Sequence, residues 1–188
     1  MVDVAIVGGG AAGLSAGLFT AKNGLETIVF DGDGTWLHSA HLFNYLGHRS
    51  ISGPELLRIA RGQTRDRGAE VKTDEEVESI EVIDDGFVLQ TEEADYQARY
   101  VVLATGANRD LAEDLGCIFT EQDTVDVSLS METSIPGIYA TGAMVRDQEW
   151  QAIISAGDGG AAALDILSKE KGEHFHDFDT PDDVPTFQ

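Results

Sequence analysis

The sequence is poor in cysteine and in positive charge. One cysteine, Cys117, stands among 188 residues, which excludes an internal disulfide and a cysteine-based metal cluster. Twelve lysine and arginine residues face 34 aspartate and glutamate residues, giving a formal net charge of −22 at pH 7. A surface of this sign repels nucleic-acid phosphates and anionic membranes, so we expect no nucleic acid and no membrane among its partners.

Long apolar runs are also absent. No segment reaches the roughly 18 apolar residues of a membrane-spanning helix. Residues 1–7 lead directly into a predicted strand and leave no room for a signal peptide, so we expect a soluble, cytoplasmic protein. The acidic residues are spread along the chain, which predicts a halophilic protein, because molar salt shortens the screening length to about 3 Å and relieves self-repulsion. An ordinary acidic protein is the alternative.

The hydrophobic pattern predicts an α/β fold. Residues 2–7 are typical of a buried strand, 11–23 of a helix and 27–30 of a second strand, and together they form a βαβ unit. Further strands are predicted at 76–83, 86–91, 96–98, 100–104 and 138–141, and further helices at 54–67 and about 148–171. The expected architecture is a Rossmann-like domain with a parallel central sheet and a small additional β-meander.

A glycine-rich turn joins the first strand to the first helix. Gly8, Gly10 and Gly13 fit the pattern G-x-G-x-x-G. The first glycine permits a tight turn, the second lets the backbone approach a pyrophosphate, and the third lets helix and strand pack closely. Asp31 ends the second strand, where a carboxylate accepts hydrogen bonds from an adenosine ribose and disfavours NADP. We therefore expect a dinucleotide here.

Several later segments, together with this turn, resemble the thioredoxin reductases of the pyridine nucleotide-disulfide oxidoreductase family. Residues 101–106 (VVLATG) are similar to the family's apolar strand that ends in ATG. Residues 133–142 (TSIPGIYATG) resemble its second FAD motif, and residues 151–165 (QAIISAGDGGAAALD) its helix beneath the flavin ring. Weaker similarity lies at 44–47 and 52–57. The match runs in order from residue 1 to roughly 170.

This resemblance implies FAD as the cofactor. It implies phosphates at the glycine-rich turn, the ribose at Asp31 and the adenine beside Val77. The cofactor-binding residues expected on this basis are Gly8, Gly10, Ala11, Ala12, Gly13, Asp31, Gly32, Asn44, Val77, Ala104, Thr105, Gly106, Gly142, Ala143, Gln151 and Ala152. Metal ligands are not expected.

The sequence departs from the family in three respects. Residues 1–106 and 123–171 correspond to the two FAD segments, but a short link replaces the NADPH domain between them, and with that domain the redox CxxC is missing. Ala143 stands where the family has an acid that holds the ribityl hydroxyls, a loss worth about 1.5–3 kcal/mol unless Asp147 substitutes. Trp150 stands where an arginine is usual. We expect one FAD-binding domain over 1–171 and an acidic tail over 172–188, either disordered or laid on a partner.

A few other residues have alternative interpretations. His38 and His41 are weak catalytic candidates for proton transfer near the flavin, against ordinary packing or hydrogen bonding. Trp36, Phe43 and Tyr45 either shield the ring or fill the core. Cys117 is expected to be a buried apolar residue.

Two functions remain open. One is an FAD-dependent oxidoreductase that receives electrons from NADH or from an electron-donor protein. The other is a non-catalytic FAD-binding sensor or interaction module. A small NAD dehydrogenase is a third possibility, which the ATG strand and the second FAD motif oppose. Loss of a domain uncovers apolar surface, so we expect a homodimer or a hetero-complex.

Overall fold

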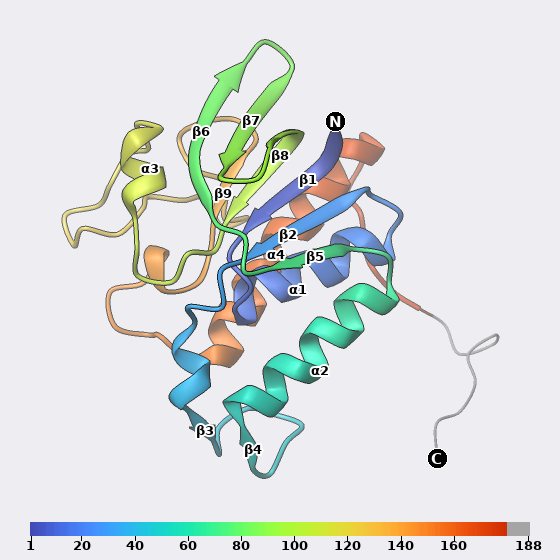
Figure 1. Ribbon diagram of the computed structural model, residues 1–188, viewed down its shortest axis with the longest axis vertical. Helices are drawn as coiled ribbons and strands as arrows, with labels where there is room; N and C mark the ends of the chain where they lie inside the picture. Colours follow the sequence, from blue (N-terminus) through green and yellow to red (C-terminus); the bar gives the residue numbers. More distant parts are fainter. Residues whose placement is uncertain (180–188) are drawn as a thin grey trace.

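The computed structural model describes residues 1–179. Its main sheet has seven strands in the order β5-β2-β1-β8-β7-β6, with β9 also paired to β8 (Figure 1). The strands are β1 (Val2–Val7), β2 (Thr27–Asp31), β5 (Glu70–Thr73), β6 (Val77–Ile83), β7 (Gly86–Thr91), β8 (Asp95–Leu103) and β9 (Ile138–Ala140). Strands β5, β2, β1, β8 and β9 are parallel, whereas β6 and β7 are antiparallel. The predicted α/β class, with a mostly parallel sheet and a small antiparallel addition, is confirmed.

The helices are α1 (Ala11–Lys22), α2 (Gly53–Asp66), α3 (Asp110–Asp114) and α4 (Ala152–Lys171). Helices α1 and α4 pack side by side against the sheet, and α2 packs on α1 next to β5 (Figure 1). The approach of α4 to α1 requires glycine, because a Cβ at Gly159 would lie 2.0 Å from the Ala12 carbonyl oxygen. Two short strands, β3 (His41–Leu42) and β4 (Ile51–Ser52), form a separate antiparallel pair.

Both faces of the central strand β1 are buried. Val4 and Ile6 pack with residues of α4 such as Ile166, while Ala5 and Val7 belong to the cluster on the opposite face. This explains why residues 4–7 of the strand are all apolar, since a parallel strand covered on both faces has no polar side.

The structure corrects several predicted elements. The strands predicted at 96–98 and 100–104 are one strand, β8, whose polar first half pairs with the antiparallel hairpin strand β7. The last helix begins at Ala152 rather than near residue 148, because Gln151 is extended, with φ −102° and ψ 139°. Strand β5 and helix α3 were not predicted: both are short and rich in charge, so neither shows a clear apolar period.

The acidic segment after α4 turns back onto the domain as far as residue 179. Lys22 Nζ, on α1, lies 2.7 Å from Asp177 Oδ1 and 2.5 Å from Asp179 Oδ2. The Phe175 amide donates a hydrogen bond to Ser168 Oγ at 3.0 Å. The described part of the predicted tail, residues 173–179, thus contacts α1 and α4, and the rest, 180–188, lies outside the described residues.

No helix within residues 1–179 combines the length and the apolar character needed to cross a membrane.

Candidate nucleotide-binding site

A pocket of about 740 Å³ lies at the carboxyl ends of the parallel strands. Val7, Asp31, Ala104 and Thr141, which end or directly follow β1, β2, β8 and β9, all contribute to its wall. Ligands of open α/β sheets bind at this edge, and the volume is within the range of small-molecule sites.

The structure places most of the residues predicted from the sequence in the lining of this one pocket. Those that line the pocket are Gly8, Gly10, Ala11, Ala12, Asp31, Gly32, Val77, Ala104, Thr105, Gly106, Gly142, Ala143, Gln151 and Ala152. Two lie behind it. A Cβ at Gly13 would lie 1.9 Å from the Gly8 carbonyl oxygen, so this glycine serves helix packing. Asn44 Nδ2 donates a hydrogen bond to Gln151 Oε1 at 2.8 Å and so adjoins the lining.

The glycine-rich turn presents backbone to the pocket. Gly8 has φ +116°, and a Cβ there would lie 2.2 Å from the Ala104 carbonyl oxygen. Helix α1 begins at Ala11 with Gly10 as its N-cap, and no side chain caps it. The first amide groups of α1 are therefore free to donate to an anion, aided by the positive end of the helix dipole.

Asp31 is held by partners that the sequence did not reveal. Its side chain accepts a hydrogen bond from Arg61 Nε at 2.7 Å and one from the Asp33 amide at 3.0 Å, and the residue is only 1% exposed. Arg61 also pairs with Asp33, and this hydrogen bond, followed by that from His38, lowers the pKa of the Asp33 carboxyl. Arg61 lies on α2, and no local sequence signal links it to the end of β2. The ion pair and the Asp33 amide together fix the orientation of the Asp31 carboxylate at the edge of the pocket.

The second glycine segment and the start of α4 form the opposite wall. Gly142 has φ +74° and a Cβ there would meet Ala12 and Ser155 at 3.3–3.6 Å, so the turn is close to both helices. Ala143 is 9% exposed and contributes no polar atom beyond its backbone. Asp147 is exposed and lies outside the pocket lining, so it does not replace the acid absent at 143. Gln151 is the N-cap of α4 and makes no side-chain capping hydrogen bond, which leaves this helix N-terminus open as well.

Neither histidine candidate lies in the pocket wall. His38 Nε2 lies 2.8 Å from Asp33 Oδ1, and His41 Nε2 lies 2.8 Å from Ser50 Oγ. Both rings thus have local hydrogen-bond partners; that of His38, Asp33, lines the pocket, whereas that of His41, Ser50, does not.

The aromatic residues and the cysteine divide between surface and core. Trp36 and Phe43 are exposed, so the core interpretation is wrong for them, whereas Tyr45 packs against the small cluster of Leu42, Ile51 and Leu56. Cys117 is 8% exposed within the main core, and burial raises the pKa of its thiol. Its expected role as a buried apolar residue is confirmed.

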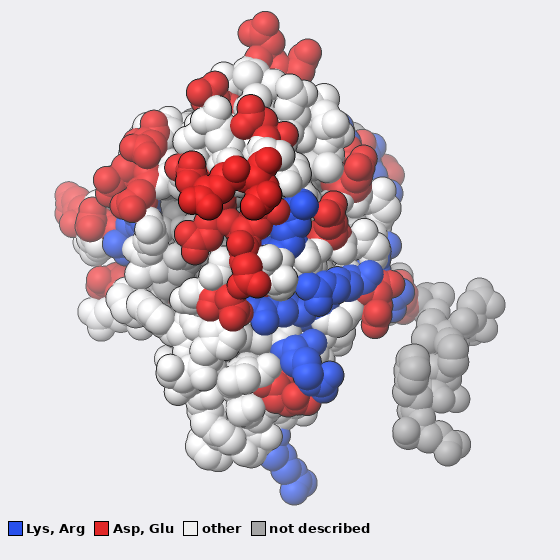
Figure 2. Space-filling model, viewed as in Figure 1, with Lys and Arg blue, Asp and Glu red and all other residues white. Residues whose placement is uncertain are grey.

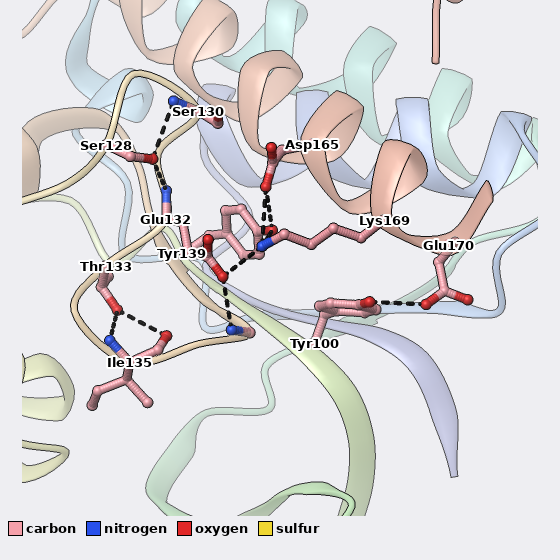
Figure 3. Close-up of polar contacts among 11 residues, drawn as sticks. Tyr100, Ser128, Ser130, Glu132, Thr133, Ile135, Tyr139, Asp165, Lys169 and Glu170 are labelled. Atoms are coloured by element: carbon pink, nitrogen blue, oxygen red, sulfur yellow. Dashed lines mark hydrogen bonds and ion pairs between the residues drawn. The ribbon is translucent and has the colours of Figure 1, made fainter. Parts of the chain in front are cut away.

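A polar network outside the pocket lining ties β9 to α4 (Figure 3). The buried Tyr139 hydroxyl donates to Asp165 Oδ2 at 2.6 Å, and Lys169 Nζ donates to the same hydroxyl at 2.8 Å. Lys169 also pairs with Glu132 at 2.5 Å. Burial, helped by Asp165, raises the pKa of Tyr139 far above its usual range, so the hydroxyl stays protonated. Because β9 leads into the second glycine segment and α4 begins at the pocket, this network fixes both relative to each other.

Charge is unevenly distributed around the site. Acidic side chains gather over β6, the turn before it and α3, whereas basic side chains follow α2 (Figure 2). One side of the pocket is accordingly acidic, through Glu75, Glu76, Glu78, Asp110 and Asp114. The other side is lined mainly by apolar residues, Trp36, Leu37, Ala40, Leu42 and Trp150.

Comparison with known proteins identifies the family. The chain matches the pyridine nucleotide-disulphide oxidoreductase family over two overlapping stretches, residues 2–107 and 48–160, and it belongs to that family. A thioredoxin reductase from Peptoclostridium acidaminophilum is 35% identical over 119 residues, 61% of this chain and 36% of the relative. One from Mycolicibacterium smegmatis is 30% identical over 171 residues, 89% of this chain and 51% of the relative. The chain thus spans about a third to a half of these relatives, and the resemblance to thioredoxin reductases is confirmed.

Solved structures show the same fold. A thioredoxin reductase from Gloeobacter violaceus superposes with a TM-score of 0.86 at 20% identity, covering 95% of this chain and 99% of that one. A ferredoxin-flavin thioredoxin reductase from Clostridium acetobutylicum gives a TM-score of 0.78 at 18% identity, covering 92% and 99%. At this identity the likeness concerns the fold alone.

Proposed function

We propose that residues 1–171 form a single FAD-binding domain that acts as an oxidoreductase. The observation that carries this proposal is the convergence of two separate glycine segments on one pocket. Gly8–Ala12 and Thr141–Ala143 belong to different parts of the chain, yet both line the same pocket at the carboxyl ends of the strands. A site made by the first glycine motif alone would not account for the position of the second segment.

The residues present fit FAD at most points. The open N-terminus of α1 would bind the pyrophosphate, Asp31 the adenosine ribose and Val77 the adenine. Gln151 and Ala152 would lie at the ring, where the N-terminal end of α4 favours negative charge. FAD, when bound, supplies the electron-transfer chemistry. Ala143 is the point of poorest fit, because it cannot replace a carboxylate acceptor.

Electrons would arrive from outside the domain. The link of residues 107–122 holds one short helix, α3, and is shorter than the roughly 30 residues of a βαβ unit. The sole cysteine is buried. We therefore propose NADH or a separate electron-donor protein as the source, and a homodimer or hetero-complex as the working form.

The visible spectrum of the purified protein tests this function. Protein prepared in about 2 M KCl, where charge repulsion is screened, is expected to show flavin absorption or to acquire it with added FAD. NADH, a reduced ferredoxin and dithionite are then tried in turn. Bleaching of the flavin absorption by NADH or by reduced ferredoxin supports an oxidoreductase. Protein that takes up no FAD, or whose flavin resists all three, contradicts it.

A second function is a non-catalytic FAD-binding sensor or interaction module. It is favoured by the pocket wall, in which the described residues include no histidine and no cysteine. Exposed apolar side chains such as Phe43 and Leu46 offer a surface for a partner. Sedimentation in high salt with oxidised and with reduced flavin separates the two functions, because a sensor changes its assembly with redox state and a simple electron carrier does not.

A further inference from the structure

The two tryptophans of the chain meet at the pocket. Trp36 and Trp150 both line it, and their ring centroids lie 5.3 Å apart at an interplanar angle of 46°. They are far apart in sequence and remain 62% and 43% exposed. An exposed pair of large aromatic rings costs hydrophobic free energy, so its position on a pocket rim calls for a ligand-related reason.

Both rings are attached to well-anchored backbone. Trp36 begins a short 3-10 helix, Trp36–Ser39, whose N-cap Thr35 accepts a hydrogen bond from the Leu37 amide at 3.4 Å. Trp150 Nε1 donates to the Arg146 carbonyl at 2.8 Å, and Arg146 pairs with the buried Asp158 of α4 at 2.5 Å. The pair therefore bridges the segment after β2 and the segment before α4.

The position of the pair distinguishes the two ends of the pocket. Trp150 directly precedes Gln151, the N-cap of α4, and Leu37 and Leu42 extend the apolar wall beside Trp36. The opposite end, at Glu75, Glu76 and Glu78, is acidic. The tryptophan end therefore accommodates a large planar apolar group.

We propose that Trp36 and Trp150 together form an aromatic clasp: the packed pair lies against one side of the flavin ring and excludes water from it. This inference rests on the proposed FAD function. Contact between an aromatic side chain and a planar heterocycle typically changes affinity by about 5- to 150-fold per side chain. The carboxylate absent at position 143 corresponds to a loss of about 10- to 100-fold. The affinity gained from the two tryptophan rings is thus comparable to the affinity lost at position 143.

Comparison of FAD with ADP tests the clasp, because ADP carries the adenosine and phosphates but not the isoalloxazine ring of the flavin. Calorimetric titrations are done on the wild type, Trp36→Ala/Trp150→Ala, Trp36→Phe/Trp150→Phe and the control Phe178→Ala, an exposed aromatic outside the pocket lining. We expect the double alanine variant to lose at least tenfold in FAD affinity with ADP affinity unchanged. The double phenylalanine variant should retain most of the FAD affinity, and Phe178→Ala all of it.

Tryptophan fluorescence gives a readout that does not depend on turnover. Trp36→Phe leaves only Trp150 to emit and Trp150→Phe only Trp36, so each ring is observed separately. FAD should quench both and ADP neither. Unquenched emission with unchanged FAD affinity overturns the clasp while the proposed function stands, whereas a wild type that binds neither nucleotide overturns both. If the double alanine variant misfolds and loses ADP as well, quenching in the single phenylalanine variants decides.

Discussion

Gly10→Ala separates the role of the glycine-rich turn in binding from its role in folding. Gly10 has φ −81° and ψ −170°, which alanine adopts without strain. The nearest atom to an added Cβ is Thr35 Oγ1 at 3.5 Å, an ordinary contact. Alanine is a poorer N-cap than glycine, but it also reduces the entropy of the unfolded chain, and the two effects nearly cancel. We expect the free energy of unfolding to change by no more than about 0.5–1 kcal/mol.

Nucleotide affinity should respond much more strongly. The added methyl group lies at the N-terminus of α1, where the free amides would contact the pyrophosphate. Displacing the phosphates weakens one or two hydrogen bonds to a charged acceptor, each worth about 1.5–3 kcal/mol. The Kd for FAD should therefore rise roughly 10- to 100-fold or more. Thermal unfolding without ligand and calorimetric titration with FAD measure the two quantities independently.

Two further glycines serve as controls. A Cβ at Gly62 on α2 meets nothing within 4 Å, so Gly62→Ala should leave FAD binding intact and slightly raise stability. Gly13→Ala should instead destabilise the fold, because its Cβ would overlap the Gly8 carbonyl oxygen at 1.9 Å. If Gly10→Ala binds FAD as tightly as Gly62→Ala, the turn is not the phosphate site and the reasoning fails.

Three other outcomes are expected. Ala143→Asp should tighten FAD binding by about tenfold or more and lower the stability of the ligand-free protein, since it places a charge at a buried position; titration and melting curves check both. The unfolding midpoint should rise steeply between about 0.1 and 3 M KCl, and a midpoint indifferent to salt contradicts a halophilic protein. Burial raises the pKa of the Cys117 thiol, so its contribution to stability is complete below the ordinary thiol pKa of about 8.5 and is lost as the pH rises through the folded-state value. Cys117→Ala should flatten that alkaline decline in the free energy of unfolding. If the decline with pH is unchanged in the variant, the thiol is not its cause.

Local signals predicted the parts of the site that the backbone makes. Gly8 and Gly10 lie in one short segment between a strand and a helix, so spacing alone indicated the turn. The apolar strands were equally visible, because burial on both faces leaves a short run of apolar residues, such as residues 4–7 and 101–103. Strand β5 was not visible, since a short charged strand at the edge of a sheet looks like a loop.

Contacts between distant segments could not be predicted in this way. Arg61 reaches Asp31 from α2, and Trp36 meets Trp150 across most of the chain. Each pair depends on how helices pack on the sheet, which one sequence does not encode as a local pattern. The start of α4 at Ala152 is a similar case, because the anchoring of Trp150 and Arg146 outside the helix is tertiary.

The charge of the pocket bears on how any phosphate could be held. Within the described chain, its wall contains carboxylates but no lysine or arginine, and Arg61 is already engaged by Asp31 and Asp33. An anion must therefore be bound by the backbone amides and dipoles of α1 and α4, against the field of a chain with net charge −22. Such short-range donors keep their strength in concentrated salt, whereas the long-range repulsion is screened beyond about 3 Å at 1 M. A pocket that binds phosphate through glycine and helix ends, and a ring through tryptophan, is consistent with a very acidic surface in a way that a lysine-lined pocket is not.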